Sequence, residues 1–252
     1  MIEIKNLSVC IDNNKLIDDV SFVLREGEIV SVIGQNGSGK TVLLRTIAGL
    51  VKNYSGNIIV NSGLYGNKKE MTAAYFPDYS DIDNDETVYN HAIFKVMKKK
   101  PLWKTVNVLE IERVKNLLSD FGLSEYLNNS TKKLSDSVLK MLYISDVVSS
   151  GKKLLLMDNP DTVLDYRCQN ILRKEMLKFV MNGTGGIIFT TNNVNFAVQL
   201  SDRIIVLKNG CIHCSGTDDI ISEELIREIY GCESFVNRNV ITGKKEVYVN
   251  YI

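Results

Sequence analysis

The segment GQNGSGKT, residues 34 to 41, constrains the fold more than any other part of the chain. It follows the apolar run IVSVI, which is typical of a strand buried in a parallel sheet, and it precedes a helical pattern from about Ser38 to Leu50. A glycine-rich turn in this position aims backbone N–H groups and a helix N-terminus at an anion. The segment therefore predicts an α/β fold with a phosphate-binding site.

Each residue type in this segment has a place in such a site. The spacing matches G-x-x-x-x-G-K-[ST], whose glycines allow the backbone to wrap phosphate groups. Lys40 would supply positive charge between the β- and γ-phosphates, and the Thr41 hydroxyl would ligate Mg²⁺. The expected ATP-binding residues here are Gly34, Asn36, Gly37, Ser38, Gly39, Lys40 and Thr41.

An apolar strand that ends in an acid is the partner feature of a triphosphate site. KLLLMD, residues 153 to 158, provides such a strand, and Asp158 is expected to hold the Mg²⁺ shell. Because it comes after the glycine-rich segment and after a helical stretch, we assign Asp158 with Thr41 to the metal site.

The middle of the chain differs in pattern from both ends. Between residues 78 and 150, apolar residues recur at three- and four-residue spacing with charged residues between them, which predicts helices. Strand and helix alternation resumes afterwards with GIIFTT and RIIVL. We predict one domain, 1–252, in which a helical lobe (78–150) is inserted into an α/β core formed by 1–77 and 151–252. The core would hold a mostly parallel sheet and an N-terminal antiparallel β subdomain.

Composition restricts the partners and the location. Lys plus Arg and Asp plus Glu both number 30, and this balance argues against nucleic-acid binding. No stretch approaches the roughly 18 apolar residues that span a bilayer, and the opening MIEIKNLSV is not a signal peptide. We expect a cytoplasmic protein that reaches a membrane only through a partner.

The cysteines are expected to be reduced thiols rather than a disulfide framework. CIHC, residues 211 to 214, lacks a second ligand pair nearby for zinc, so a metal or redox role is the minor alternative. We interpret the segment as part of a β-hairpin with Asn209-Gly210 at its turn.

Taken together, IEIKNLSV, the glycine-rich segment, LLLMDNP and DTVLD resemble the motifs of the nucleotide-binding subunits of ATP-binding-cassette (ABC) transporters, over essentially the whole chain. The tail, residues 216 to 249, is similar to tails of the iron–siderophore, haem and cobalamin uptake class. The resemblance implies Mg-ATP as ligand and a second cassette as partner. It also implies a permease docked on the helical lobe, at the inner face of the cell membrane.

Several positions depart from the family pattern. Asn159 stands where the family has the glutamate that polarises the attacking water, and Asn192 stands where a histidine contacts the γ-phosphate. Asp78 replaces a glutamine; it retains the capacity to ligate Mg²⁺ but cannot donate a hydrogen bond to the nucleophile. Ile11 stands in place of the aromatic residue that stacks on adenine, so adenine stacking is expected to be weak.

The signature LSGGQ, which closes on the partner's nucleotide, reads LSDSV at residues 134 to 138. Asp136 would place a carboxylate at that helix start, where we expect it to satisfy the backbone donors and to repel the γ-phosphate. Ser135 remains, and we expect it to cap the helix or to contact ATP. The family pattern is kept at Lys40, Thr41, Asp158 and Asp165.

An amide has no usable basicity at neutral pH, and the loss of a positioned base typically costs ~10²–10⁴ in rate. We therefore predict a transporter subunit that binds Mg-ATP to drive or gate a permease, hydrolyses it slowly or not at all, and pairs with a fully equipped cassette. One alternative is a hydrolysis-competent importer ATPase for iron–siderophore-, haem- or cobalamin-type solutes, with Asp161 in place of the lost base. The other is an ATP-sensing interaction module without transport.

Overall fold

The computed structural model describes residues 2–60, 73–78, 85–98, 101, 105–181 and 185–250. The strands are β1 (Ile2–Ile11), β2 (Asn14–Leu24), β3 (Ile29–Ile33), β4 (Ser55–Val60), β5 (Ala73–Phe76), β6 (Leu154–Met157), β7 (Gly186–Thr190), β8 (Arg203–Lys208), β9 (Cys211–Gly216), β10 (Ser234–Arg238) and β11 (Lys245–Val249). The α-helices are α1 (Lys40–Ile47), α3 (Val88–Met97), α4 (Val108–Asp120), α5 (Asp136–Val148), α6 (Tyr166–Met181), α7 (Val194–Leu200) and α8 (Glu223–Tyr230).

The central sheet has the strand order β5-β6-β7-β3-β8-β9, and β9 is its antiparallel edge strand. β3 pairs in parallel with β7 on one side and with β8 on the other. All five residues of β3 are buried, which explains why four of them are apolar and why its sequence, IVSVI, does not alternate between apolar and charged residues. The predicted mostly parallel core is confirmed.

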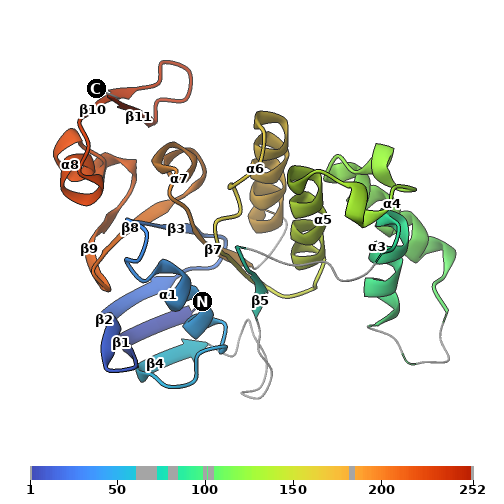
Figure 1. Ribbon diagram of the computed structural model, residues 1–252, viewed down its shortest axis with the longest axis horizontal. Helices are drawn as coiled ribbons and strands as arrows, with labels where there is room; N and C mark the ends of the chain where they lie inside the picture. Colours follow the sequence, from blue (N-terminus) through green and yellow to red (C-terminus); the bar gives the residue numbers. More distant parts are fainter. Residues whose placement is uncertain are drawn as a thin grey trace.

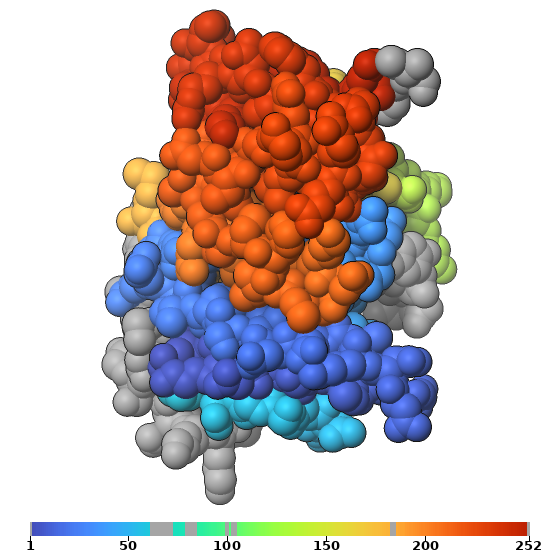
Figure 2. Space-filling model, turned by 90° about the vertical axis from the view of Figure 1, so that its left-hand side faces the viewer, coloured from blue at the N-terminus to red at the C-terminus, as the bar shows by residue number. Residues whose placement is uncertain are grey.

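A second sheet, β2-β1-β4, is antiparallel throughout. Its inward side chains, among them Ile4 and Val9, pack in one core cluster with Leu43 and Leu44 of α1 and with β3. Figure 2 shows these N-terminal strands (blue and cyan) directly beneath β8, β9 and the C-terminal segment (orange and red). The predicted N-terminal antiparallel subdomain is therefore confirmed, and it rests against the helix that follows the glycine-rich segment.

Three helix limits differ from the sequence prediction. α1 begins at Lys40 rather than Ser38, because Gly39 precedes it with φ 104°, and it ends at Ile47 rather than Leu50. α6 begins at Tyr166, ahead of residues 169–180 (QNILRKEMLKFV), whose pattern predicts a helix. An Asp165 side-chain oxygen accepts a hydrogen bond from the Cys168 N–H at 2.7 Å. α7, which Asn193 caps, was not predicted, because its seven residues are too few to display a helical period.

The helical lobe, α3 to α5, lies on the opposite side of the central sheet from the C-terminal segment (Figure 1). α4 starts with a capping box between Asn107 and Glu110, and Thr87 caps α3. Val88, Leu118 and Leu142, one from each helix, share a core cluster with Leu155 of β6. No helix among the described residues is both long and apolar enough to cross a membrane.

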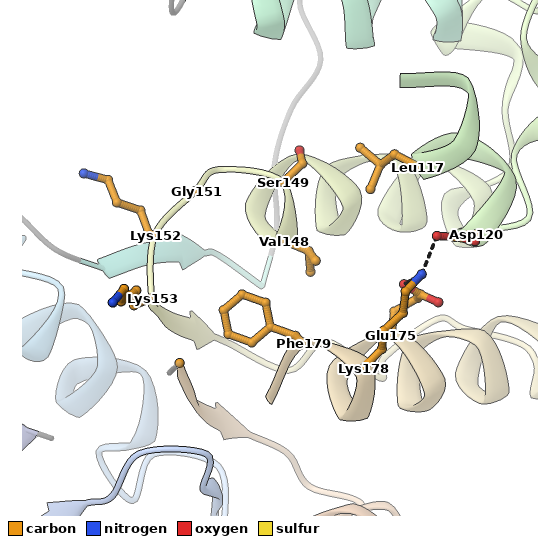
Figure 3. Close-up of a pocket in the computed structure, with 11 residues that line it drawn as sticks. Leu117, Asp120, Val148, Ser149, Gly151, Lys152, Lys153, Glu175, Lys178 and Phe179 are labelled. Atoms are coloured by element: carbon orange, nitrogen blue, oxygen red, sulfur yellow. Dashed lines mark hydrogen bonds and ion pairs between the residues drawn. The ribbon is translucent and has the colours of Figure 1, made fainter. Parts of the chain in front are cut away.

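The far edge of the lobe meets the core at an ion pair. Figure 3 shows Asp120, at the end of α4, joined to Lys178 of α6, while the Phe179 ring lies on the side toward Val148 and Lys153. The Lys178 ammonium lies 2.5 Å from the Asp120 carboxylate, and both side chains are almost half exposed. These residues line a hollow of about 440 Å³ near the amino ends of β6 and β7. The site described below lies at the opposite, carboxyl ends of these strands.

His91 of α3 lies between two acids of the lobe. Its Nδ1 lies 2.9 Å from Glu86 and its Nε2 lies 2.7 Å from Asp146, which also pairs with Lys95 at 3.2 Å. Burial lowers the pKa of His91, but the hydrogen bonds and charges of Asp146 and Glu86 outweigh it, so the pKa is raised overall.

A raised folded-state pKa means that protonated His91 stabilises the fold fully below the unfolded pKa of about 6.5. This stabilisation is lost as the pH rises through the higher folded-state pKa. We expect the melting temperature to fall over that range, with hydrogen exchange in α3 and α5 accelerating first. His91→Gln should flatten this pH dependence, and an unchanged profile in the variant would contradict the assignment.

Candidate functional site

Lys40 is held inside the glycine-rich segment. Its ammonium donates hydrogen bonds to the carbonyls of Gly34, at 2.6 Å, and Gln35, at 2.9 Å, and the side chain is buried. Burial lowers the pKa of Lys40, while the charge of Asp158 raises it. The segment therefore curls around a cation within electrostatic reach of an acid at the end of β6, two strands away from β3 in the sheet.

Two glycines are required by close backbone contacts. Gly34 has φ 149°, and a Cβ atom there would collide with the carbonyl oxygen of Leu207 in β8. Gly39 has φ 104°, and a Cβ atom there would lie 2.7 Å from the carbonyl oxygen of Leu16 in β2. A side chain at either position would push the segment away from β8 or β2. Residues 34–41, called the cradle below, therefore need glycine at both positions.

The remaining predicted residues of the segment lie around this cradle. The Ser38 carbonyl accepts a hydrogen bond from the Gly210 N–H at 3.0 Å. Asn36 and Gly37 are exposed at the rim, and Thr41 exposes its side chain in the first turn of α1. The amide nitrogen of Asn192 donates to Asn36 Oδ1 at 2.9 Å, so the position of the family's histidine does lie beside the segment.

Asp158 lies at the carboxyl end of β6, as predicted, and is 1% exposed. Its Oδ1 accepts a hydrogen bond from the Thr190 hydroxyl at 2.6 Å, and its N–H donates to the Phe76 carbonyl at 2.9 Å. A fixed carboxylate facing Lys40, with the Thr41 hydroxyl exposed at the start of α1, is a donor set that suits Mg²⁺ bound together with phosphates. The residues present therefore fit a Mg-nucleoside triphosphate.

Asn159 is fixed by its neighbours in a conformation that few residues adopt. Its φ is 45°, in the left-handed region that asparagine tolerates better than most residues. Its N–H donates to the Thr190 hydroxyl at 2.9 Å, and its side-chain nitrogen donates to Asp78 Oδ2 at 3.1 Å. Its buried Oδ1 has no hydrogen-bond partner among the described residues. This side chain orients an acid, but it cannot take up a proton.

Asp78 is the last described residue before the gap at 79–84, and its carboxylate is already occupied by protein donors. Besides Asn159, it accepts a hydrogen bond from the Thr162 hydroxyl at 3.2 Å, and it lies 3.7 Å from the Lys140 ammonium. The resemblance implied Asp78 as a Mg²⁺ ligand; in this structure both of its oxygens face other side chains.

Asp161, the alternative base, is buried and accepts a hydrogen bond from the Thr191 hydroxyl at 2.8 Å. Burial raises its pKa, and the bond from Thr191 lowers it, with the rise prevailing. Its carboxylate therefore ties the loop after β6 to the end of β7.

Ser135 lies in the helical lobe rather than in the cradle. Its hydroxyl accepts a hydrogen bond from the Val138 N–H at 3.5 Å and caps α5, as expected. Asp136 is exposed in the first turn, and the expectation that it would satisfy the donors of this helix start fails for Val138, whose N–H bonds to Ser135.

Sequence reasoning missed Lys140, Thr162 and Thr190. The sequence does contain an indication of the lysine, because Lys140 shares the buried stripe of α5 with Met141 and Ile144, where a charge needs a partner. It contains no such indication of the two threonines, since threonine is common both in strands and in loops.

Two other predictions concern residues near the site. Ile11 is 43% exposed at the end of β1 and presents no aromatic ring. The hairpin of β8 and β9 with Asn209-Gly210 at its turn is confirmed. Among the described residues, no group of three or more metal-binding side chains is present, around the CIHC segment or elsewhere.

Residues 17 to 162 match the family model described as ABC transporter. The chain is 28% identical over 260 residues to a spermidine/putrescine import ATP-binding protein of Borreliella afzelii, covering 100% of this chain and 73% of that protein. A solved ABC transporter of metal-chelate type, in an inward-facing conformation, superposes with a TM-score of 0.81 at 18% identity, over 99% of this chain and 97% of the other.

A dimeric ATP-binding cassette in a post-hydrolysis state, bound to ADP and phosphate, superposes with a TM-score of 0.73 at 20% identity, covering 86% of this chain and 98% of the other. These structural likenesses show the cassette fold. Since the family model covers more than half of the chain and starts before the cradle, the chain belongs to the ABC transporter family, as an ATP-binding subunit.

Proposed function

We propose that this subunit binds Mg-ATP through Lys40, Thr41 and Asp158 and hydrolyses it slowly or not at all. ABC cassettes bind ATP with Mg²⁺. The metal would be held by Thr41 and Asp158, where its charge would neutralise the phosphates. The observation that carries the proposal is Asn159: its amide donates to Asp78, so the position expected to hold a base is engaged as a hydrogen-bond donor.

Slow hydrolysis follows from what the side chains can do with protons. A general base must lie within hydrogen-bond reach of the water that it activates. Asn159 has no basic atom, and the carboxylate of Asp161 is directed to Thr191. This contact favours impaired hydrolysis over the alternative in which Asp161 replaces the base. Asn192 retains an N–H donor beside the cradle, but its amide cannot take up a proton. This residue can therefore support nucleotide binding but not proton transfer during ATP hydrolysis.

ABC cassette subunits dimerise and work with a membrane permease. We infer that this chain drives or gates an importer, since a matched relative carries import in its name. The tail at 216–249 and the likeness to a metal-chelate type transporter point to iron–siderophore-, haem- or cobalamin-type solutes. The helical lobe, the expected permease contact, would place the subunit at the inner face of the membrane and argues against a sensor without transport.

The proposed site is tested by Lys40→Ala. The substitution removes the only ammonium inside the cradle among the described residues, so affinity for a fluorescent ATP analogue in Mg²⁺ should fall at least tenfold. Lys178→Ala, which changes a half-exposed lysine of α6 that pairs with the lobe far from the cradle, is the control and should bind like the wild type. Tight binding that survives Lys40→Ala would refute the site.

A further inference from the structure

Lys140 is a buried cation of α5 that contacts two other segments at once. From α5, its ammonium donates to the Asn159 carbonyl at 2.7 Å and to the Thr162 hydroxyl at 2.5 Å, both in the loop after β6. It also lies 3.7 Å from Asp78, which follows β5, and 5.7 Å from the centre of the Phe76 ring. A single side chain of the helical lobe therefore holds the core loop that follows Asp158.

The same cation stands among acids. Burial lowers the pKa of Lys140, while the charges of Asp78, Asp161 and Asp158 raise it. The lysine therefore lies within electrostatic reach of three carboxylates at the edge where the cradle opens. Asp78 is only half buried, but Asp158 and Asp161 are shielded from water, so their charges are screened poorly by solvent.

The contacts of Asp78 connect this cation to the Asn159 position. Asp78 accepts hydrogen bonds from Asn159 and from Thr162, and the Lys140 ammonium bonds to both of those residues. The four residues form a closed ring of polar contacts. Without the lysine, the ring would keep its carboxylate and lose its countercharge, next to the place where a triphosphate must bind.

We propose that Lys140 is a positioning residue of the nucleotide site: its ammonium neutralises Asp78 and holds it on Asn159 and Thr162, so that the acid neither repels the phosphates nor serves as a Mg²⁺ ligand. This inference rests on the proposed Mg-ATP site. It assigns Asp78 to the lysine, in place of the metal role implied by the family resemblance.

The test is a charge rescue, measured as affinity for a fluorescent ATP analogue at fixed Mg²⁺. Lys140→Met should weaken binding at least threefold, because the Asp78 charge is left without its partner. Adding Asp78→Asn should restore the affinity to within twofold of the wild type. A merely structural lysine would not be rescued by removal of an acid. Lys178→Met, which breaks a different ion pair between lobe and core, should change nothing.

The metal role of Asp78 is tested separately by titrating Mg²⁺ at fixed nucleotide. Asp78→Asn alone should leave the Mg²⁺ midpoint within twofold of the wild type. A shift larger than threefold, or Lys140→Met binding that equals the wild type or is not rescued, would overturn the inference. If Lys140→Met does not fold, Lys140→Gln serves in the same comparison. Lys40→Ala in the same assay distinguishes the outcomes, since its loss of binding upholds the nucleotide site even where the Lys140 result fails.

Discussion

Turnover of ATP by the purified chain should lie ~10²–10⁴-fold below the roughly 1 per second of a working transporter ATPase. The reason is how the side chains of the site donate and accept hydrogen bonds. Asn159 donates to Asp78, Asp161 accepts from Thr191, and Asn192 offers an amide where a histidine would stand. Phosphate release, with Lys40→Ala setting the background, measures the rate. Wild-type turnover near 1 per second would contradict the proposal that ATP hydrolysis is impaired.

Restoring the family residues should help only modestly. Asn159→Glu places a second carboxylate against Asp78, and the left-handed backbone at φ 45° costs a non-glycine residue about 1–2 kcal/mol. Combining it with Asn192→His adds a proton carrier, but Asp136 still faces the partner's nucleotide in the expected dimer. A jump to full activity in this double variant would show that the two asparagines alone account for the deficit.

The second large effect concerns assembly: sustained ATP-driven uptake should require a different, fully equipped cassette beside this one. In the family arrangement, each nucleotide lies between the cradle of one chain and the signature of the other. A homodimer would carry Asn159 and the LSDSV signature in both sites. In a mixed pair, one site would retain ATP as a clamp, and the other would have the partner's base and turn over slowly.

Native mass spectrometry of the transporter purified with its permease gives the stoichiometry directly. One copy of this chain with one copy of another cassette is the expected result. A comparison in which only this chain is supplied should yield complexes with no uptake above the level of Lys40→Ala. Two copies of this chain with sustained uptake would refute the pairing.

Local patterns predicted the parts of the site that depend on neighbouring residues. The glycine-rich segment and KLLLMD were located from sequence because each combines a buried strand with polar residues at fixed spacing. Ser135 was expected to cap its helix and does so. These features arise within about ten residues, a range over which backbone chemistry decides the structure.

The contacts that sequence could not supply are long-range. The Lys140 ammonium reaches a loop 19 residues further along the chain, and the Asn159 amide reaches Asp78 from 81 residues away. Neither pairing leaves a periodic trace, because only the packing of α5 against the sheet brings the groups together. Asp136 is a local case instead, because one of the donors that it was expected to satisfy, the Val138 N–H, bonds to the neighbouring Ser135.

The placement of β3 between β7 and β8 has a consequence for how the protein is made. The cradle follows β3 early in the chain, yet its walls include the Leu207 carbonyl and the Gly210 N–H. A ribosome must therefore deliver the chain as far as Gly210 before this pocket is complete. Until then the nascent chain has no complete ATP site. Nucleotide binding therefore cannot stabilise early folding intermediates, and it can stabilise only late states in which the site is formed.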